Sequence, residues 1–275
     1  MPRGGWRGKA RVRSLPGVFE KYLKLYLTGY NAPMTEFFTA VVYQPIYNAL
    51  AFFIGSVPGG DVGLAIIALT ILIRLALFPL SWSAIKTQMI MRQLEPELKA
   101  IREKYKQEQE ELARRTMAVF KEKKINPFAS FFLILIQLPV IIGLYMVLQN
   151  ESRGIAFDPA LLYSFVAAPL DASVVFLGMV DLTGKSIILA LIVAATQFIF
   201  AKLMAPPKTP EKAGEKPSFQ EDFQKSMSIQ MLYVFPVILG VVAYATSAAI
   251  ALYFVVSNTF SIGQELFVRK IHGKR

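Results

Sequence analysis

The sequence has no cysteine, and its one histidine, His272, lies in a basic tail. The absence of cysteine excludes a disulfide framework, a thiolate nucleophile, and zinc or iron–sulfur sites with cysteine ligands. A single histidine nearly excludes histidine metal clusters and histidine-based general acid–base catalysis. No carboxylate pair or metal-ligand spacing takes their place. The sequence therefore predicts no metal, no cofactor and no enzymatic activity.

The chain is instead rich in hydrophobic residues, which make up 54% of the total and give a positive mean hydropathy of +0.45. Such a composition is unusual for a soluble domain and typical of a polytopic membrane protein. The formal net charge of +11 fits either nucleic acid or anionic lipid as a partner, and its meaning depends on which loops carry it. We therefore predict one all-α membrane domain.

The stretch from 61 to 82, DVGLAIIALTILIRLALFPLSW, can cross a bilayer as a helix, because about 20 apolar residues span a hydrocarbon core of roughly 30 Å. Arg74 interrupts it, and arginine in mid-span costs about 2.5 to 3.5 kcal/mol. Such residues usually face a bundle interior or a water-filled cavity. The alternative is that Arg74 reaches the nearer surface, but Trp82 lies about 12 Å of helix rise further on. Thr70 and Ser81 share one helical face with Arg74, which predicts a polar stripe.

Four further apolar stretches follow, separated by charged or polar segments. The predicted division of the chain is a basic extension (1–33), an N-terminal helix (34–60), span 1 (61–82), a helical hairpin (83–127), span 2 (128–149), a loop (150–182), span 3 (183–204), a linker (205–227), span 4 (228–246), span 5 (247–268) and a basic tail (269–275). In the hairpin, apolar residues recur at helical spacing between charges that are ordinarily solvated. The turn between spans 4 and 5 is expected near Thr246 and Ser247.

Two features near the N-terminus leave alternatives open. Residues 1–33 are basic and contain several glycines, and we expect an extension with little stable structure. A sharp change of composition at Met34 raises the hypothesis that Met34 is the physiological start. Residues 37–56 are apolar enough to span, yet Pro45 and Asn48 interrupt them, so a helix lying on the membrane surface competes with a true span.

Counts of basic residues predict the orientation. The hairpin has eleven Lys or Arg, the linker four and the tail four, against one in the loop 150–182. By the positive-inside rule the hairpin, linker and tail are cytoplasmic and the loop is outside. With five spans the N-terminal extension would be outside despite its seven basic residues. This conflict disappears if Met34 is the start or if 37–56 is a sixth span.

Taken in order, several stretches resemble the YidC-type insertases of the Oxa superfamily. They are YQPIYNAL, GLAIIALTILIRLALFPLS, QLEPELKAIREKYK in the hairpin, KKINP followed by LIQLP, and LYFVVSN near the end. The resemblance covers nearly everything from about residue 36 to 270. It implies a five-helix transmembrane core with a cytoplasmic helical hairpin, and a polar groove that is open to the cytoplasm and lipid but closed outside. It also makes residues 37–56 an amphipathic helix at the outer surface, which favours five spans.

Carried over position by position, the resemblance assigns six residues to the substrate groove: Arg74, Thr70, Gln137, Tyr253, Ser257 and Asn258. Arg74 matches the groove arginine, and Thr70 the polar residue one turn before it. Phe254 stands where some relatives have a second tyrosine, which puts substrate contacts there in doubt. For Gln137 and Asn258 the alternative is an interhelical hydrogen bond that merely holds the bundle, worth about 0.6 to 2 kcal/mol.

The function implied by the resemblance is insertion of nascent membrane proteins, alone or with the Sec translocon. The chain would act as a monomer in the bacterial plasma membrane, with its C-terminus in the cytoplasm. Ribosome contact is also implied, and Lys270, Lys274 and Arg275 are the candidate residues. Attraction to anionic lipid or control of topology is the alternative role for this tail.

A secondary transporter or channel is the main competing function. Coupled transport usually places Asp, Glu or His within spans, whereas Asp61, Asp181 and Glu265 lie at or near predicted span ends. No inverted repeat is apparent either, because the hairpin has no counterpart in the second half of the chain. The sequence therefore favours a protein insertase over a transporter, and both over a membrane enzyme.

Overall fold

The computed structural model describes residues 36–123, 125, 129–150, 157–205 and 226–272. Most of these are helical, and one small two-stranded sheet is found among them. Three helices in the described part are long and apolar enough to cross a membrane: Glu36–Ser56, Ile187–Met204 and Ser226–Ala245. A fourth results if the bent pair Val62–Ala76 and Phe78–Lys104 counts as one span. The chain is thus a mostly helical protein with several candidate membrane spans, as its composition predicts.

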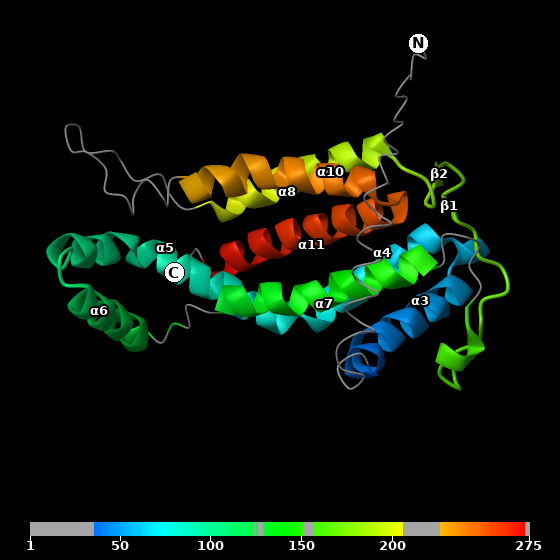
Figure 1. Cartoon of the computed structure of the whole chain (residues 1–275), viewed down its shortest axis with the longest axis horizontal. Helices are drawn as coiled ribbons and strands as arrows, with labels where there is room; N and C mark the ends of the chain where they lie inside the picture. The colour runs from blue at the N-terminus through cyan, green and yellow to red at the C-terminus, as the bar shows by residue number, and fades with distance from the viewer. Residues whose placement is uncertain (1–35, 124, 126–128, 151–156, 206–225, 273–275) are drawn as a thin grey trace, which may run out of the picture.

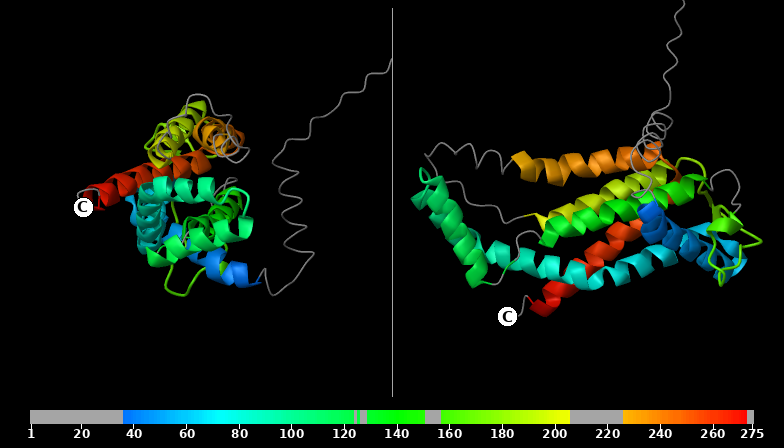
Figure 2. Two further views of the ribbon diagram at one scale, coloured as in Figure 1. Left: turned by 90° about the vertical axis from the view of Figure 1, so that its left-hand side faces the viewer. Right: turned by 60° about the horizontal axis from the view of Figure 1, so that its bottom comes forward.

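Helices that lie side by side along the long axis form the body of the molecule (Figure 1). They are α4 (Val62–Ala76), α7 (Ala129–Asn150), α8 (Ile187–Met204), α10 (Phe235–Ala245) and α11 (Ala248–His272). The π-helical turn η4 (Gln230–Val234) leads into α10. α11 is central, because α8 packs on it from one side, α4 and α7 contact it from the other, and α10 packs on α8 (Figure 2). The turn between α10 and α11 falls at Thr246 and Ser247.

Two hydrophobic clusters flank α11. The larger one joins α3 (Gln44–Ser56), α4, α7 and α11, with Leu50, Ile66, Val147 and Leu252 among its members. The smaller one joins α8, α10 and α11 around Val193, Ala243 and Ala251. α8 and α10 approach closely at Gly240, where an added Cβ would lie 3.0 Å from the Cβ of Ala194. Small residues at such crossings are typical of membrane helix pairs, in which close backbone approach supplies the packing energy.

A sharp bend interrupts the stretch from 61 to 82 that was expected to form one straight helix. α4 ends at Ala76, α5 (Phe78–Lys104) begins after Leu77, and the two axes differ by 61°. Pro79 lies in the first turn of α5, where its missing N–H is tolerated, but it cannot continue the hydrogen-bond ladder of α4. The structure therefore differs from the prediction here, and α5 runs without a break across the expected boundary at residue 82.

α5 and α6 (Gln109–Glu122) pack on each other at one end of the bundle (Figure 1). Their contact is a small apolar cluster formed by Leu94, Leu98, Val119 and Ile125. Charged side chains dominate elsewhere: Glu111 pairs with Arg114 and Arg115 at 2.8 Å each. The two helices thus share a small apolar contact, and charged side chains cover much of the rest of their surface.

At the opposite end, α3 follows the π-helical turn η1 (Thr39–Tyr43) and packs against the loop around residues 157–163. The side-chain nitrogens of Gln44 and Asn48 both donate to the carbonyl of Leu161, at 3.1 and 2.9 Å. The Oδ1 of Asn48 accepts from the backbone N–H of Tyr163 at 2.6 Å. The polar residues that interrupt 37–56 therefore form hydrogen bonds with backbone groups of this loop. Their presence does not by itself decide whether 37–56 lies on the membrane surface or spans the membrane.

The same loop contains η3 (Pro159–Leu161) and two antiparallel strands, β1 (Val175–Phe176) and β2 (Val180–Asp181), with Val175 opposite Asp181. η2 (Pro58–Gly60) joins α3 to α4 beside it. The N–H of Ser173 donates to the carbonyl of Gly60 at 2.9 Å, and the N–H of Val62 donates back to Ser173 at 3.0 Å. Gly60 has φ +60°, and an added Cβ would lie 1.8 Å from the carbonyl oxygen of Asp171, so only glycine fits. The loop is thus fixed to the start of α4.

Candidate functional site

Polar side chains from three helices converge on α11, and most of them are residues that the sequence singled out. Arg74 comes from the last turn of α4, Gln137 from the middle of α7, and Tyr253, Ser257 and Asn258 from α11 itself. The last three lie one turn apart or adjacent, so they share one region of the α11 surface. Each of the neighbouring helices α4, α7 and α8 reaches this region through one hydrogen bond.

The first hydrogen bond joins α4 to α11: the Nη2 of Arg74 donates to the Oγ of Ser257. The bend after Ala76 places Arg74 in the last turn of α4 rather than in the middle of a long span. A cation in that position is favoured by the partial negative charge of the helix C-terminus. None of the ion pairs found in the described part of the chain includes Arg74. Its charge is therefore met there by a hydroxyl and a helix end, and not by a carboxylate.

The second hydrogen bond joins α7 to α11. The Nε2 of Gln137 donates to the hydroxyl of Tyr253 at 2.6 Å. The same hydroxyl also contacts Ser257, one turn further along α11. Arg74, Ser257, Tyr253 and Gln137 thus form one chain of polar contacts across three helices. Such a chain can hold the helices together, and it can also exchange partners with polar groups of a bound polypeptide.

The third hydrogen bond joins α11 to α8, and it includes a residue that the sequence did not single out. The Nδ2 of Asn258 donates to the Oγ1 of Thr196 at 3.3 Å. The hydroxyl of Thr196 in turn donates to the carbonyl of Ile192 in its own helix, at 2.8 Å. A threonine in an apolar helix usually bonds back to its own backbone, so nothing in the sequence marked Thr196 as a partner of Asn258.

Thr70 does not join this polar chain. Its Oγ1 donates to the carbonyl of Ile66 at 2.6 Å, within α4, and its side chain is only 1% exposed. The structure thus brings together five of the six residues assigned to the groove and leaves Thr70 buried and hydrogen-bonded within its own helix.

The burial of these residues differs along the polar chain. Tyr253 and Ser257 are each 3% exposed and Asn258 is 7% exposed, whereas Arg74 and Gln137 are only partly buried. The α11 residues are therefore covered by the neighbouring helices, and the two side chains from α4 and α7 offer the accessible edge.

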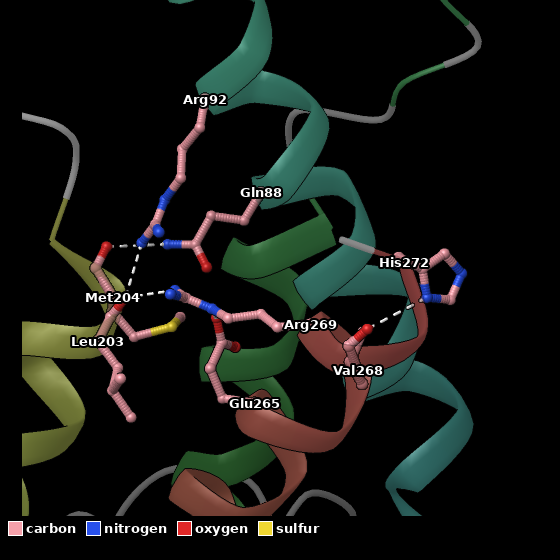
Figure 3. A network of polar contacts seen from close by, with 8 residues as sticks. All are labelled: Gln88, Arg92, Leu203, Met204, Glu265, Val268, Arg269 and His272. Atoms are coloured by element: carbon pink, nitrogen blue, oxygen red, sulfur yellow. Dashed lines mark hydrogen bonds and ion pairs between the residues drawn. The ribbon is translucent and has the colours of Figure 1, made fainter. Parts of the chain in front are cut away.

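A second polar cluster lies near the C-terminal ends of α8 and α11 (Figure 3). The Nη2 of Arg269 and the Nη2 of Arg92 both donate to the carbonyl of Leu203, the latter at 2.9 Å, and the Nε2 of Gln88 donates to Met204 at 3.4 Å. These carbonyls belong to the last turn of α8, which has no intrahelical donors for them. Side chains from α5 and α11 therefore cap α8, a long-range contact that could not be predicted from the sequence.

Glu265 completes the second cluster. Its Oε1 accepts from the Nε of Arg269 at 2.7 Å, and the carboxylate is 1% exposed with Oε2 left without a partner in the structure. Burial, together with the nearby charge of Arg269, lowers the pKa of Arg92. The spacing of Glu265 and Arg269, four residues apart on one helix, was the only signal that could have revealed the pair.

The basic tail is described only in part. Lys270 is exposed in the last turn of α11, while Lys274 and Arg275 lie outside the described residues. Within the described ranges, no group of three or more His, Cys, Asp or Glu side chains is placed to hold a metal ion.

The sequence comparisons agree with this architecture. Residues 53–275 match the family described as 60Kd inner membrane protein. A protein named Membrane protein insertase YidC from Clostridium tetani is 30% identical over 244 residues, which is 89% of this chain and 95% of that protein. One of the same name from Fusobacterium nucleatum is 29% identical over 231 residues, or 83% of this chain and 97% of that protein.

Other relatives are much longer than this chain. The protein named Membrane protein insertase YidC from Polynucleobacter necessarius is 28% identical over 261 residues, which is 93% of this chain but only 40% of that protein. The chain thus spans nearly the whole of some relatives and less than half of others. Because the family match covers most of its length, the chain belongs to the 60Kd inner membrane protein family, the family of the YidC-type proteins.

Proposed function

We propose that this protein is a membrane protein insertase, which takes nascent membrane proteins from the cytoplasm into a polar groove and releases their spans sideways into lipid. The relatives that it matches over nearly their whole length carry the name insertase. The observation in this structure that carries the proposal is the contact of Arg74 with Ser257 between α4 and α11, where this cation has no carboxylate partner among the residues that the structure describes. A structural arginine in an apolar helix would normally be neutralised by a carboxylate.

The physical task of an insertase fits this polar chain. A client segment with a polar or acidic flank must carry that flank across hydrocarbon, at a cost of several kcal/mol for each unsatisfied group. Arg74 would attract carboxylates or carbonyls, and Gln137 and Tyr253 would exchange hydrogen bonds with the passing chain. The apolar part of the client would then leave into lipid without any covalent step.

The arrangement of charges supports one orientation. The charged helices α5 and α6 and the basic end of α11 lie at one end of the bundle, and the described part of the loop, residues 157–182, which contains no Lys or Arg, lies at the other (Figure 1). We place the first end in the cytoplasm of a bacterium and the second outside. In this proposal α4, α7, α8, α10 and α11 are the five spans, α5 and α6 form the cytoplasmic hairpin, and α3 lies at the outer surface. The C-terminus is cytoplasmic.

Partners follow from the same proposal. The clients are nascent membrane proteins, reached by the monomer alone or together with the Sec translocon. Lys270, with Lys274 and Arg275 beyond the described residues, is the proposed ribosome contact, through salt-sensitive attraction to RNA phosphates. Attraction of the same residues to anionic lipid is the competing role, and co-sedimentation with translating ribosomes after deletion of residues 269–275 separates the two.

A reconstitution experiment tests the function. The full chain is placed in lipid vesicles, and a small membrane protein with a short translocated tail is synthesised outside them. Protection of the tail from protease, absent in empty vesicles and reduced by Arg74→Glu, is the expected result. Flux of ions or small solutes without insertion of the client would instead identify a channel or transporter.

A further inference from the structure

The β1–β2 hairpin in the outer loop carries apolar side chains on both of its faces. Phe176 points inward, where its ring lies so close to α4 that a Cβ added to Gly63 would come within 2.1 Å of it. Val175 on β1 is 40% exposed, and Leu177 and Met179 in the turn between the strands are 60% and 84% exposed. Asp181, the cross-strand partner of Val175, is the polar residue on the outward face. Because turns usually carry Gly, Asn, Asp or Ser, the two exposed apolar side chains make the tip of this hairpin unlike an ordinary solvated turn.

The hairpin is held firmly in place. The Oδ2 of Asp61 accepts from the backbone N–H of Leu177 at 2.8 Å. The Oδ1 of Asp61 caps α4 by accepting from the N–H groups of Gly63 and Leu64, at 2.7 and 3.1 Å. One buried carboxylate thus ties the tip of the hairpin to the first turn of α4. The exposed apolar side chains of the tip are therefore held in place by these hydrogen bonds.

Leu177 occupies a backbone conformation that leucine rarely adopts. Its φ is 51°, in the left-handed region where glycine or asparagine is usual at a turn. A branched, fully apolar side chain at this position gains nothing from water or from the turn. Its presence is explained if the exposed side chain contacts an apolar environment that compensates for the backbone strain.

The position of the hairpin indicates which apolar environment this is. Lys185 and Tyr244, at the same end of the molecule, form a cation–π contact at 5.8 Å, and lysine and tyrosine are residues that gather at membrane–water interfaces. Just beyond them, Ile187 and Ile188 at the start of α8 are 56% and 69% exposed. β1 and β2 lie beside this end of α8 and α10 (Figure 1). The hairpin therefore lies at the end of the molecule at which these apolar side chains of α8 are exposed.

We propose that the tip of this hairpin, with Leu177 and Met179 at its end, inserts among the acyl chains of the outer leaflet and anchors the outer end of α4 to the membrane. Asp181 at the base of the hairpin stays at the level of the headgroups. Its carboxylate accepts from the N–H and the hydroxyl of Thr183 at 2.9 and 2.7 Å. This proposal rests on the location of the chain in a membrane, and it does not depend on insertase activity.

The absence of cysteine makes the test direct, because each added cysteine is unique. The full chain is reconstituted in phosphatidylcholine–phosphatidylglycerol vesicles as three variants: Met179→Cys, Val241→Cys as the reference in lipid, and Ala113→Cys as the reference in water. Val241 is 61% exposed on α10, and Ala113 is exposed on the charged helix α6. Each cysteine carries an environment-sensitive fluorophore, with nitroxide groups on the acyl chains as quenchers in lipid and iodide as the quencher in water.

The label at position 179 should show blue-shifted emission, quenching by the nitroxide lipids and little quenching by iodide, close to the behaviour at position 241. A label at 179 that behaves like the one at 113 overturns the proposal. Blue-shifted emission without nitroxide quenching also overturns it, because the tip would then be covered by protein, and disulfide dimers of Met179→Cys would identify a second copy as the cover. Because Met179 is a surface residue, unchanged thermal stability of the variant checks that the fold is intact.

Discussion

Arg74 on α4 donates a hydrogen bond to Ser257 on α11, and no ion pair in the described part of the chain involves this arginine. The two helices are thus joined by a charge and a hydroxyl. In the proposed function, a carboxylate of a client would meet a cation that has no carboxylate partner among the described residues. The positive charge at position 74 is therefore the feature of the site that mutation can test most simply.

We expect Arg74→Lys to keep much of the insertion activity, since the charge remains even though the planar guanidinium is lost. Arg74→Ala and Arg74→Glu should lose most of it. Insertion of the client into vesicles is the measurement, with circular dichroism and thermal stability as checks on folding. Normal insertion by a well-folded Arg74→Glu variant would remove this residue from the mechanism.

The bond between Gln137 and Tyr253 separates a packing role from a role in client handling. Gln137→Leu and Tyr253→Phe each remove one partner, and a purely interhelical bond predicts a loss of about 1 kcal/mol of stability with activity unchanged. A double-mutant cycle on thermal unfolding in detergent gives the coupling energy. If the pair also serves clients, insertion falls in Gln137→Leu by more than the stability loss accounts for. Equal activity in both single variants and the wild type would assign the bond to packing alone.

Arg269→Ala should destabilise the protein by about 3 kcal/mol, because it leaves the carboxylate of Glu265 buried and unpaired. The matched variant Arg92→Ala removes a donor to the same carbonyl of Leu203 but no ion pair, so its effect should be clearly smaller. Melting temperatures in detergent measure both. Restoring stability with Glu265→Gln in the Arg269→Ala background would show that the uncompensated charge is the cause, and equal effects of the two arginine variants would argue against it.

Acidification should weaken α6 through Glu111. Hydrogen bonds from Arg114, then from Arg115, lower the pKa of this carboxyl from its ordinary value of 4.5 to about 2. A carboxyl with a lowered pKa stabilises the fold above its unfolded pKa, and this contribution is lost as the pH falls through the folded value. The loss should therefore fall between about pH 4.5 and pH 2. Titration of the Glu111 carboxyl by NMR measures the lowered pKa. The loss of stability over this pH range should be absent in Glu111→Gln.

The mostly helical membrane fold could be predicted from the sequence because its causes are local. Long apolar runs separated by charged segments favour membrane helices wherever they occur. The bend at Leu77 was missed although Pro79 signalled it, because the apolar composition of 61–82 continues unchanged through the break. Composition reports burial in an apolar environment, but it does not report the direction of the helix axis.

The candidate site could be predicted only as a set of residues. The resemblance to YidC-type proteins pointed to Arg74 and Gln137, but their partners Ser257 and Tyr253 are more than 110 positions away. The contacts of Arg92 and Gln88 with the end of α8 bridge similar distances in sequence. The sequence could not show either that the hydroxyl of Thr70 donates to its own helix, and its assignment to the groove stays a prediction. Which donor meets which acceptor is decided by tertiary packing.

The path of a client tests the central proposal most directly. Photo-crosslinking amino acids are placed at Lys99 or Ala113 in the helical hairpin of α5 and α6, and at Gln137 in the chain of polar contacts. Leu135, which is 43% exposed on α7, serves as a control position. Nascent clients of increasing length are then stalled on ribosomes and irradiated. The proposal predicts crosslinks first from the hairpin and then from position 137, with far fewer from 135. Clients that reach position 137 before the hairpin, or that crosslink equally at 135 and 137, would contradict it.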